Sequence, residues 1–284
     1  MSTKNGYPGV LSASTTSYPV SPMSIDLEHA LDTVRHAAKK GGEAALRRFR
    51  KDFGIEVKAD QSIVTIADRE AEAAIIDVLR AQFPDHRILG EESGAHAQSS
   101  RYRWIVDPID GTLGFARGSC FWGPLIALEY EGKILAGALA LPALDQFYSA
   151  ARGLGCWHGD RRLHVSKVSD WSQSILSLGE LRRLVAPPYG DAITGLAVSA
   201  KSARCYGDLA AATLVLEGRA EAYVEAGVKI WDLAPLPVLF EEAGGRFTDL
   251  AGGDDLEGGN AIGTNGLVHD HVLEAMRSSA EVDL

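Results

Sequence analysis

Two aspartates three residues apart, Asp107 and Asp110, follow a short apolar run, Trp104-Ile105-Val106. Such a run is typical of a buried β-strand, and the proline at position 108, which has no amide hydrogen, predicts that the regular strand ends there. The two carboxylates and the Ile109 carbonyl between them are hard oxygen donors that can converge in one tight loop. Oxygen donors of this kind are the ligands that Mg²⁺ selects, so the segment is a candidate metal site.

Gly111 and Thr112 complete this segment. Gly111 permits backbone conformations that bring amide groups close to an anion, as in turns that bind phosphate. In the alternative interpretation, Asp107 and Asp110 are ordinary residues of a solvated turn. A single D-x-x-D-G motif favours that alternative, so the interpretation depends on acidic residues elsewhere in the chain.

Further acidic residues occupy comparable positions at the ends of predicted strands or the starts of predicted helices. Asp68 follows Thr65 at a predicted helix start, where capping alone could account for both polar residues. Glu91 and Glu92 follow a short apolar strand, and surface charge is the default explanation for such a pair. Asp232 opens another predicted helix, and its position adds a positive helix end that could face an anion.

If the fold brings these element ends together, several carboxylates lie within a few ångströms of one another. Such an arrangement is strongly self-repulsive without cations. Two or more Mg²⁺ ions would remove the repulsion, and a two-metal site is a clamp for in-line displacement at phosphorus.

The composition limits the other classes of function. The chain has 284 residues and a formal net charge of −10, which argues against nucleic acid and acidic membranes as partners. Cys120, Cys156 and Cys205 have no CxxC spacing, so the sequence indicates neither a disulfide framework nor a zinc site. We therefore expect a reducing, cytoplasmic setting, and no apolar run approaches the roughly 20 residues of a membrane helix.

Residues 1–24 are rich in Ser, Thr, Pro and Gly, and we expect a disordered N-terminal tail. Helical spacing of apolar residues then predicts a long helix to about residue 50, with Ser24 as a plausible N-cap, and a second helix after Asp68. Alternating or apolar runs separated by turn residues predict an antiparallel meander over 121–130, 133–141 and 146–152, and a hairpin over 155–165.

The second half has a less regular pattern. The sequence predicts strands at 175–178, 220–225, 245–248 and 261–264, and helices from Asp208 to Gly218, from Trp231 to Gly244 and over 268–277. Helices and strands alternate along the chain with much antiparallel sheet, so the fold class is α/β.

Five segments resemble the inositol monophosphatase family of metal-dependent sugar and polyol phosphatases. The segments are VTIAD (64–68), GEES (90–93), WIVDPIDGT (104–112), GVKIWDLAP (227–235) and EEAGGRFTDL (241–250). The similarity runs from about residue 25 to 278. It implies a layered α/β sandwich of alternating helix and sheet layers, the sugar-phosphatase fold, with a phosphatase domain over 25–284 made of two packed halves, about 25–180 and 181–284. It also implies a homodimer that holds Mg²⁺ in the groove between the halves.

The resemblance assigns roles to individual residues. Glu91, Asp107 and the Ile109 carbonyl would hold the first Mg²⁺, and Asp107, Asp110 and Asp232 the second. A third, weaker Mg²⁺ near Glu91 is an open possibility.

The resemblance also assigns the groups around the attacking water. Thr112, polarised by Asp68 and assisted by Glu91, would activate that water. The amides of Gly111 and Thr112 would bind the phosphate, and hydrolysis would proceed without a covalent phosphoenzyme.

The chain departs from the family pattern at two positions. Gly114 stands where the family usually has Asn, which predicts a looser loop. Asp208 stands where inositol-selective members have a small or hydroxylated residue, and the surrounding run resembles the histidinol-phosphate phosphatase branch. Asp208 and Glu225 together suggest a cationic or polyhydroxylated leaving group, although Asp208 could instead serve only as a helix cap.

The sequence therefore predicts a Mg²⁺-dependent phosphomonoesterase acting on L-histidinol phosphate. One alternative keeps the chemistry but takes an inositol or sugar phosphate as substrate. Another is a non-catalytic protein that binds a phosphorylated metabolite, and the complete set of acidic residues and Thr112 argues against it.

Overall fold

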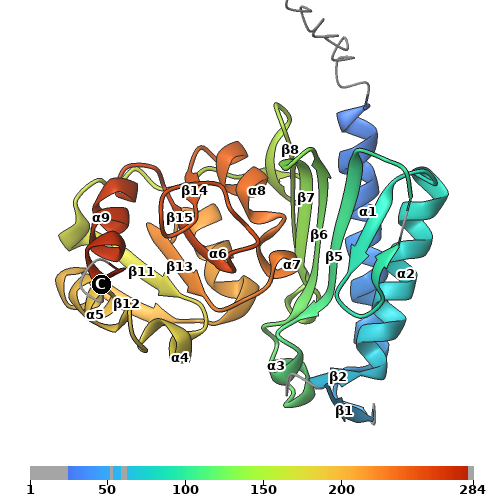
Figure 1. Ribbon diagram of the computed structural model, residues 1–284, viewed down its shortest axis with the longest axis horizontal. Helices are drawn as coiled ribbons and strands as arrows, with labels where there is room; N and C mark the ends of the chain where they lie inside the picture. Colours follow the sequence, from blue (N-terminus) through green and yellow to red (C-terminus); the bar gives the residue numbers. More distant parts are fainter. Residues whose placement is uncertain (1–24, 52–53, 59–62, 97, 281–284) are drawn as a thin grey trace, which may run out of the picture.

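The computed structural model describes residues 25–51, 54–58, 63–96 and 98–280, with the side chains of Asp208, Ser279 and Ala280 outside the description. The predicted tail, 1–24, and Ser24 within it also lie outside these ranges. Two sheets and the helices around them form alternating layers (Figure 1). Among the described residues, no helix is both long and apolar enough to cross a membrane.

The first sheet has eight strands in the order β10-β9-β8-β7-β6-β5-β3-β4. From β5 to β10 each strand pairs with the next in an antiparallel meander, whereas β3 lies parallel to β5. The sequence predicts the part of this meander from β6 to β8 and the hairpin of β9 and β10. The strands are β3 (Arg87–Gly90), β4 (Gly94–His96), β5 (Tyr102–Asp110), β6 (Gly123–Tyr130), β7 (Lys133–Leu141), β8 (Gln146–Ala151), β9 (Gly155–His158) and β10 (Arg161–Arg162).

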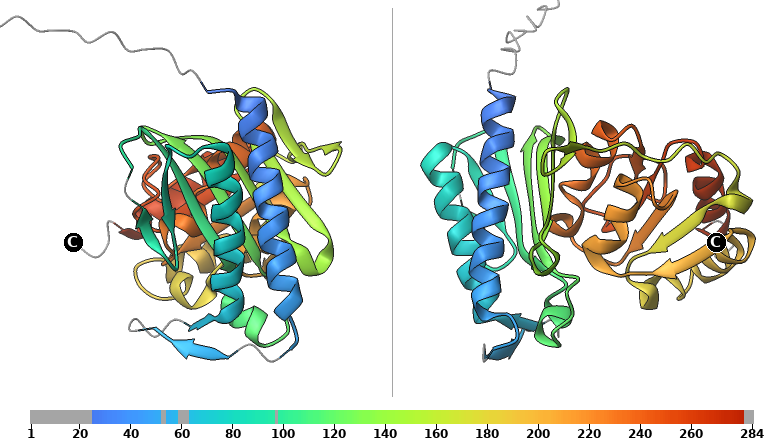
Figure 2. Two further views of the ribbon diagram at one scale, coloured as in Figure 1. Left: turned by 90° about the vertical axis from the view of Figure 1, so that its right-hand side faces the viewer. Right: turned by 180° about the vertical axis from the view of Figure 1, so that it is seen from behind.

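Two long helices, α1 (Leu27–Arg48) and α2 (Ile66–Gln82), cover one face of this sheet (Figure 2). They pack their apolar faces against Trp104 and Val106 of β5. Asp26 caps α1 by accepting the amides of residues 28 and 29, so the prediction that placed the cap at Ser24 was wrong by two residues. A short ribbon of β1 (Ile55–Val57) and β2 (Ile63–Thr65) leads into α2.

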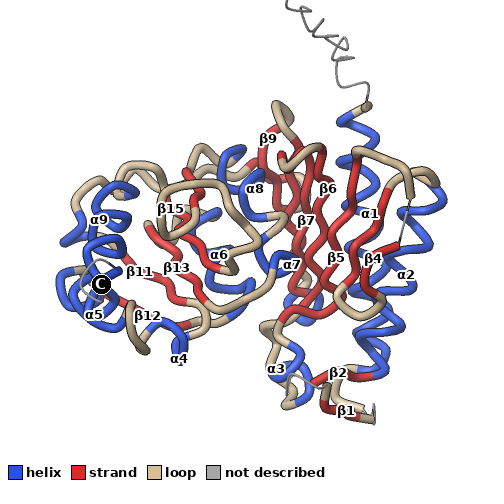
Figure 3. The backbone as a smooth tube through the Cα atoms, in the orientation of Figure 1, coloured by secondary structure: helices blue, strands red, loops and turns tan. Residues whose placement is uncertain are grey.

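The second sheet has five strands in the order β12-β11-β13-β15-β14. Strand β11 lies parallel to β12 and β13, and the other pairs are antiparallel. Figure 3 shows this sheet beside the first, with helices between them and beyond it. The strands are β11 (Ile175–Leu178), β12 (Ser202–Cys205), β13 (Ala222–Ala226), β14 (Arg246–Thr248) and β15 (Asn260–Thr264).

The remaining helices complete the layers. One apolar cluster joins Ile105 and Leu125 of the first sheet to helices between the sheets, and another joins the second sheet to α5 and α9. The helices are α3 (Thr112–Ala116), α4 (Leu181–Leu184), α5 (Gly190–Ser199), α6 (Asp208–Leu216), α7 (Ile230–Leu233), α8 (Leu236–Glu242) and α9 (His269–Ala280), with short 3₁₀ turns at Pro142–Leu144 and Trp171–Gln173. The α/β class and its alternating layers are confirmed.

Two further local predictions were wrong. Strand β5 does not end at Pro108 but continues to Asp110, because an irregularity in its pairing with β6 between Asp107 and Asp110 accommodates the proline. The single helix predicted after Trp231 is two helices, α7 and α8, with Pro235 between them. The division into halves at residue 180 remains a prediction; the chain passes from the first sheet to the second between β10 and β11.

Candidate active site

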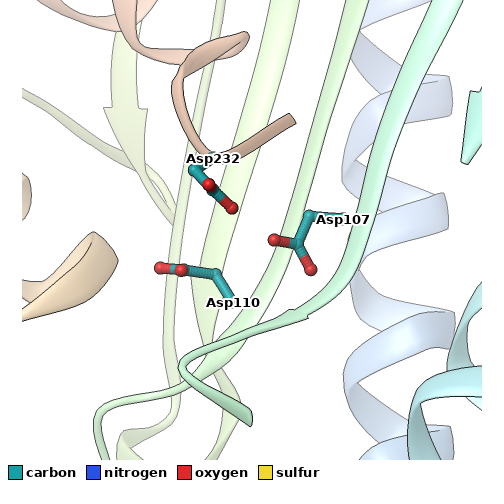
Figure 4. A group of neighbouring side chains, drawn as sticks. All are labelled: Asp107, Asp110 and Asp232. Atoms are coloured by element: carbon teal, nitrogen blue, oxygen red, sulfur yellow. The ribbon is translucent and has the colours of Figure 1, made fainter. Parts of the chain in front are cut away.

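Three aspartates from two parts of the chain meet at the end of β5. Asp107 and Asp110 come from that strand, and Asp232 comes from α7, which lies beside it. One carboxylate oxygen from each residue lies within 4.8 Å of the other two. Figure 4 shows the three side chains gathered in one region. The structure therefore brings together three of the predicted metal-binding residues.

Backbone amides hold each aspartate in place. The carboxylate of Asp107 accepts a hydrogen bond from the amide of Ile109 at 2.9 Å, which stabilises the irregular end of β5. Asp110 accepts one from the amide of Leu209 in the first turn of α6 at 2.7 Å. Asp232 accepts one from the amide of Lys229 at 2.6 Å, at the start of α7. These bonds orient the three side chains through the backbone itself.

The cluster is electrostatically unfavourable without a cation. Burial raises the pKa of Asp107 well above its ordinary value, and the neighbouring charges of Glu91, Asp232 and Asp110 raise it further. Burial also raises the pKa of Asp232, although Asp107 and Lys229 oppose this change. A bound cation would remove this penalty, and hard carboxylate oxygens suit Mg²⁺.

Glu91 directly follows β3 and is not one of the three residues within 4.8 Å, but its amide donates to the carbonyl of Val106, the residue before Asp107, at 3.0 Å. Burial raises its pKa to about 7, with smaller effects from neighbouring charges. The ammonium of Lys58 lies 3.1 Å from Glu91 Oε1 and 2.6 Å from Glu92 Oε1, so this lysine neutralises part of the acidic charge. The side chain of Glu91 is 18% exposed, which leaves it accessible from solvent.

Asp68 caps the start of α2 and also contacts Thr112. Its Oδ2 accepts the amide of Thr65 at 2.7 Å and the Thr65 hydroxyl at 2.6 Å, which forms a capping box at the start of α2. Its Oδ1 accepts the hydroxyl of Thr112 at 3.2 Å, and that hydroxyl also lies 2.9 Å from the Ile109 carbonyl oxygen. Burial raises the pKa of Asp68, and the bonds from Thr65 and Thr112 oppose this change.

The predicted phosphate-binding turn has the backbone that its sequence requires. Gly111 adopts a left-handed conformation with φ 79° and directly precedes the short helix α3. Gly114, where the resemblance predicts a looser loop, lies inside that helix and accepts a hydrogen bond from the amide of Ser119 at 2.9 Å.

The two residues predicted to contact the alcohol part of the substrate differ in their surroundings. Asp208 is the first residue of α6 after Gly207, but its side chain lies outside the described part of the structure. Glu225 is buried, and its Oε1 accepts the amides of Glu180 at 2.7 Å and Ala226 at 3.0 Å. These bonds join the end of β13 to the segment after β11, so Glu225 contributes to the local structure whether or not it also contacts a substrate.

Sequence reasoning missed three features of the site. Lys58 was assigned no role, and the amide of Leu209 carries no side-chain signal. Glu72, one turn after Asp68 on the buried face of α2, accepts amides from the turn that follows Glu91. Its helical position between buried apolar residues was the signal that could have identified it.

Comparisons with known proteins agree with this geometry. A model of the inositol monophosphatase family matches residues 26–281. A histidinol-phosphatase of Mycobacterium tuberculosis is 39% identical over 232 residues, covering 80% of this chain and 89% of that protein. An inositol-1-monophosphatase of Mesorhizobium japonicum is 33% identical over 265 residues, covering 87% of this chain and 96% of that protein.

Solved structures show the same architecture. The crystal structure of the extragenic suppressor protein suhB from Bartonella henselae has a TM-score of 0.81 and 30% sequence identity, and the match covers 87% of this chain and 98% of that one. The Thermotoga maritima IMPase has a TM-score of 0.78 and 28% identity, and the match covers 90% of this chain and 98% of that one. Because the family model spans nearly the whole chain and the fold agrees throughout, this protein belongs to the inositol monophosphatase family of phosphoric monoester hydrolases.

Proposed function

We propose that this phosphatase hydrolyses a small amino-alcohol or polyol phosphate, L-histidinol phosphate in histidine biosynthesis, by direct attack of water in the presence of Mg²⁺. The observation that carries the proposal is the meeting of Asp107, Asp110 and Asp232 within 4.8 Å, together with Glu91 beside them. We further propose two to three Mg²⁺ per subunit, a homodimer and a cytoplasmic location. The three cysteines, all among the described residues, are free thiols, which supports a reducing setting.

The proposed metal ligands are those that the family resemblance assigns. Glu91, Asp107 and the Ile109 carbonyl would hold one ion, and Asp107, Asp110 and Asp232 another. Bound Mg²⁺ supplies Lewis-acid stabilisation of the charge that develops on the phosphoryl oxygens and lowers the pKa of water.

The groups around the metal ligands would position the reactants. The Thr112 hydroxyl, held by Asp68 Oδ1 at 3.2 Å, would orient the attacking water, and Glu91 would assist in removing its proton. The amides of Gly111 and Thr112 would donate to the phosphate, because the left-handed Gly111 leads directly into a helix start.

The choice of histidinol phosphate depends on Asp208. Histidinol phosphate carries an ammonium group close to the ester carbon, whereas inositol phosphate carries hydroxyls there. A charge-assisted hydrogen bond between Asp208 and this ammonium contributes roughly 1.5–3 kcal/mol, or about ten- to a hundredfold in kcat/KM. Glu225 is the second residue proposed to contact the alcohol part. The similarity to proteins named histidinol-phosphatase supports this substrate.

Phosphate release from a panel of phosphomonoesters tests the proposal. We expect wild-type protein to prefer histidinol phosphate over inositol and sugar phosphates, to require Mg²⁺, to be inhibited by excess Ca²⁺ and to lose activity in EDTA. Asp208→Asn should lower kcat/KM for histidinol phosphate by about ten- to a hundredfold and leave inositol phosphate within a few-fold. Equal losses on both substrates would instead favour a purely structural role of Asp208 at the start of α6, where Gly207 rather than Asp208 is the N-cap.

Two alternatives remain as outcomes of the same panel. Preference for inositol phosphate would agree with the similarity to the Mesorhizobium japonicum protein. The alternative of another class is a protein that binds a phosphorylated metabolite without hydrolysing it. A protein named Nus factor SuhB, from Pasteurella multocida, is also 33% identical over 230 residues. Undiminished turnover in EDTA would contradict the metal proposal, and no turnover of any ester would favour the binding protein.

A further inference from the structure

Helix α2 carries a second buried carboxylate one turn after Asp68. Glu72 is only 3% exposed and lies on a helix face whose neighbours Ala71, Ile75 and Ile76 are buried apolar residues. A buried carboxylate is unfavourable unless hydrogen bonds or opposite charges compensate for its lost hydration. The groups that contact Glu72 therefore indicate why it is there.

Both oxygens of Glu72 accept hydrogen bonds from one turn. Oε2 accepts the amide of Glu92, and Oε1 accepts the amide of Ser93, each at 2.9 Å. Hydrogen bonds to a charged acceptor are stronger than neutral ones, and two of them from consecutive residues fix the orientation of the backbone. Glu72 thus binds the turn that begins immediately after Glu91.

Gly90 leaves room for this carboxylate. A Cβ atom at position 90 would lie 2.6 Å from Glu72 Oε2 and 2.8 Å from Ser93 Oγ, which is closer than such atoms approach in proteins. Any larger residue at this position would therefore displace the Glu72 side chain from the turn.

The turn is anchored on its other side by the strand that carries Asp107. The amide of Glu91 donates to the carbonyl of Val106 at 3.0 Å. Glu91 therefore lies between two fixed points, the end of β5 and the carboxylate of Glu72. Because Val106 directly precedes Asp107, this bond places the backbone of Glu91 beside the strand end that carries Asp107.

We propose that Glu72 is a positioning residue that directs the carboxylate of Glu91 toward the metal ion. One helix then aligns two parts of the active site, since Asp68 holds Thr112 and Glu72 holds the turn after Glu91. This inference rests on the proposed role of Glu91 as a metal ligand. Glu72 itself contacts neither substrate nor metal in this proposal.

Isothermal titration of the full-length protein with Mg²⁺ tests the inference, using Glu72→Gln. Glutamine keeps the size of the side chain but replaces one acceptor oxygen with a donor, so one of the two amides loses its partner. We expect binding of the ion assigned to Glu91 to weaken by about tenfold or more, the effect typical of groups that orient metal ligands. The ion assigned to the three aspartates should change by less than about twofold, and saturating Mg²⁺ should restore kcat.

Glu70→Gln is the matched control. Glu70 lies on the same helix but pairs with Arg48 at the surface, so its loss should leave both binding steps unchanged. Gly90→Ala disturbs the same contact from the other side and should weaken the same step. The double variant Gly90→Ala/Glu72→Gln should bind Mg²⁺ at this step no more weakly than the more affected of the two single variants, because both changes break the same interaction.

Glu91→Gln separates failure of this inference from failure of the proposed function. If Glu91→Gln weakens Mg²⁺ binding but Glu72→Gln and Gly90→Ala do not, Glu72 is only a structural residue and the inference is wrong. If Glu91→Gln also has no effect, Glu91 is not a ligand and the proposed metal site itself is wrong. A fall in urea stability of Glu72→Gln without any change in Mg²⁺ binding would also overturn the positioning role.

Discussion

Glu217 and Asp107 are both buried carboxylates, but the groups that surround them differ. Glu217 accepts a hydrogen bond from the Tyr148 hydroxyl at 2.8 Å and lies 2.9 Å from Arg219 and 3.3 Å from Arg161. Asp107 lies among other carboxylates, which raise its pKa beyond the effect of burial. The protein therefore supplies the cations around Glu217.

The difference separates a structural charge from a functional one. A buried charge whose partners are in the chain stabilises one arrangement of the fold and needs no bound ion. A group of buried carboxylates that repel one another lowers the stability of the fold unless a cation binds. Perturbed pKa values of this kind are typical of functional sites.

Asp107→Asn should reduce kcat by several orders of magnitude. Asp107 is proposed to contact both metal ions, so one substitution removes a charged ligand from each. Steady-state phosphate release at saturating Mg²⁺ measures the loss. A variant that kept more than about a tenth of the wild-type rate would show that the three-aspartate cluster is not the metal centre.

The stability of the metal-free protein should fall as pH rises. The pKa of Glu91 is about 7 in the folded protein, above its ordinary value of 4.5, so the folded state binds this proton more tightly than the unfolded state. The stabilisation of the folded state by this proton on Glu91 is fully present below about pH 4.5 and is lost as pH rises through 7. We expect a loss on the order of 3 kcal/mol in the free energy of unfolding between about pH 5 and 8.

Urea denaturation in EDTA at a series of pH values measures this loss. Glu91→Gln should have a flatter profile, and an identical profile in the variant would contradict the assignment to Glu91. Millimolar Mg²⁺ should restore stability at pH 8, by about 2.7 kcal/mol when its concentration is a hundred times the Kd.

Glu217→Gln should lower the stability of the fold without changing its dependence on Mg²⁺. It removes a buried charge that Arg161 and Arg219 neutralise, so we expect a loss of about 2 kcal/mol in the free energy of unfolding. The dependence of stability and activity on Mg²⁺ should be unchanged, because the partners of Glu217 are in the chain. A changed Mg²⁺ dependence in this variant would contradict a purely structural role of Glu217.

Asp68→Asn should produce the smallest effect. Asparagine can still accept from Thr65 through its oxygen, but it presents an amide group to the Thr112 hydroxyl. We expect kcat to fall roughly tenfold while KM and Mg²⁺ affinity stay within about twofold. Weakened Mg²⁺ binding in this variant would place Asp68 among the metal ligands instead.

Local sequence rules predicted most of the elements and the identity of the acidic residues. The apolar run through Val106 predicted a strand, the turn residues between 121–130 and 133–141 predicted an antiparallel pair, and Thr65 with Asp68 predicted a helix start. These features depend on neighbouring residues, so the chain near each one contains the necessary information. The same rules failed where tertiary contacts changed the local outcome, since pairing with β6 carries β5 past Pro108.

The convergence of the site was decided by the tertiary structure alone. Asp232 reaches Asp107 because α7 packs beside β5, and no local pattern fixes that distance. The bond from the Leu209 amide to Asp110 and the burial of Glu72 against the turn after Glu91 likewise depend on elements far apart in the chain. Residue types and their spacing identify which side chains can bind a cation. Which of those side chains share one site depends on how the layers pack, because only the fold sets the distances between charges.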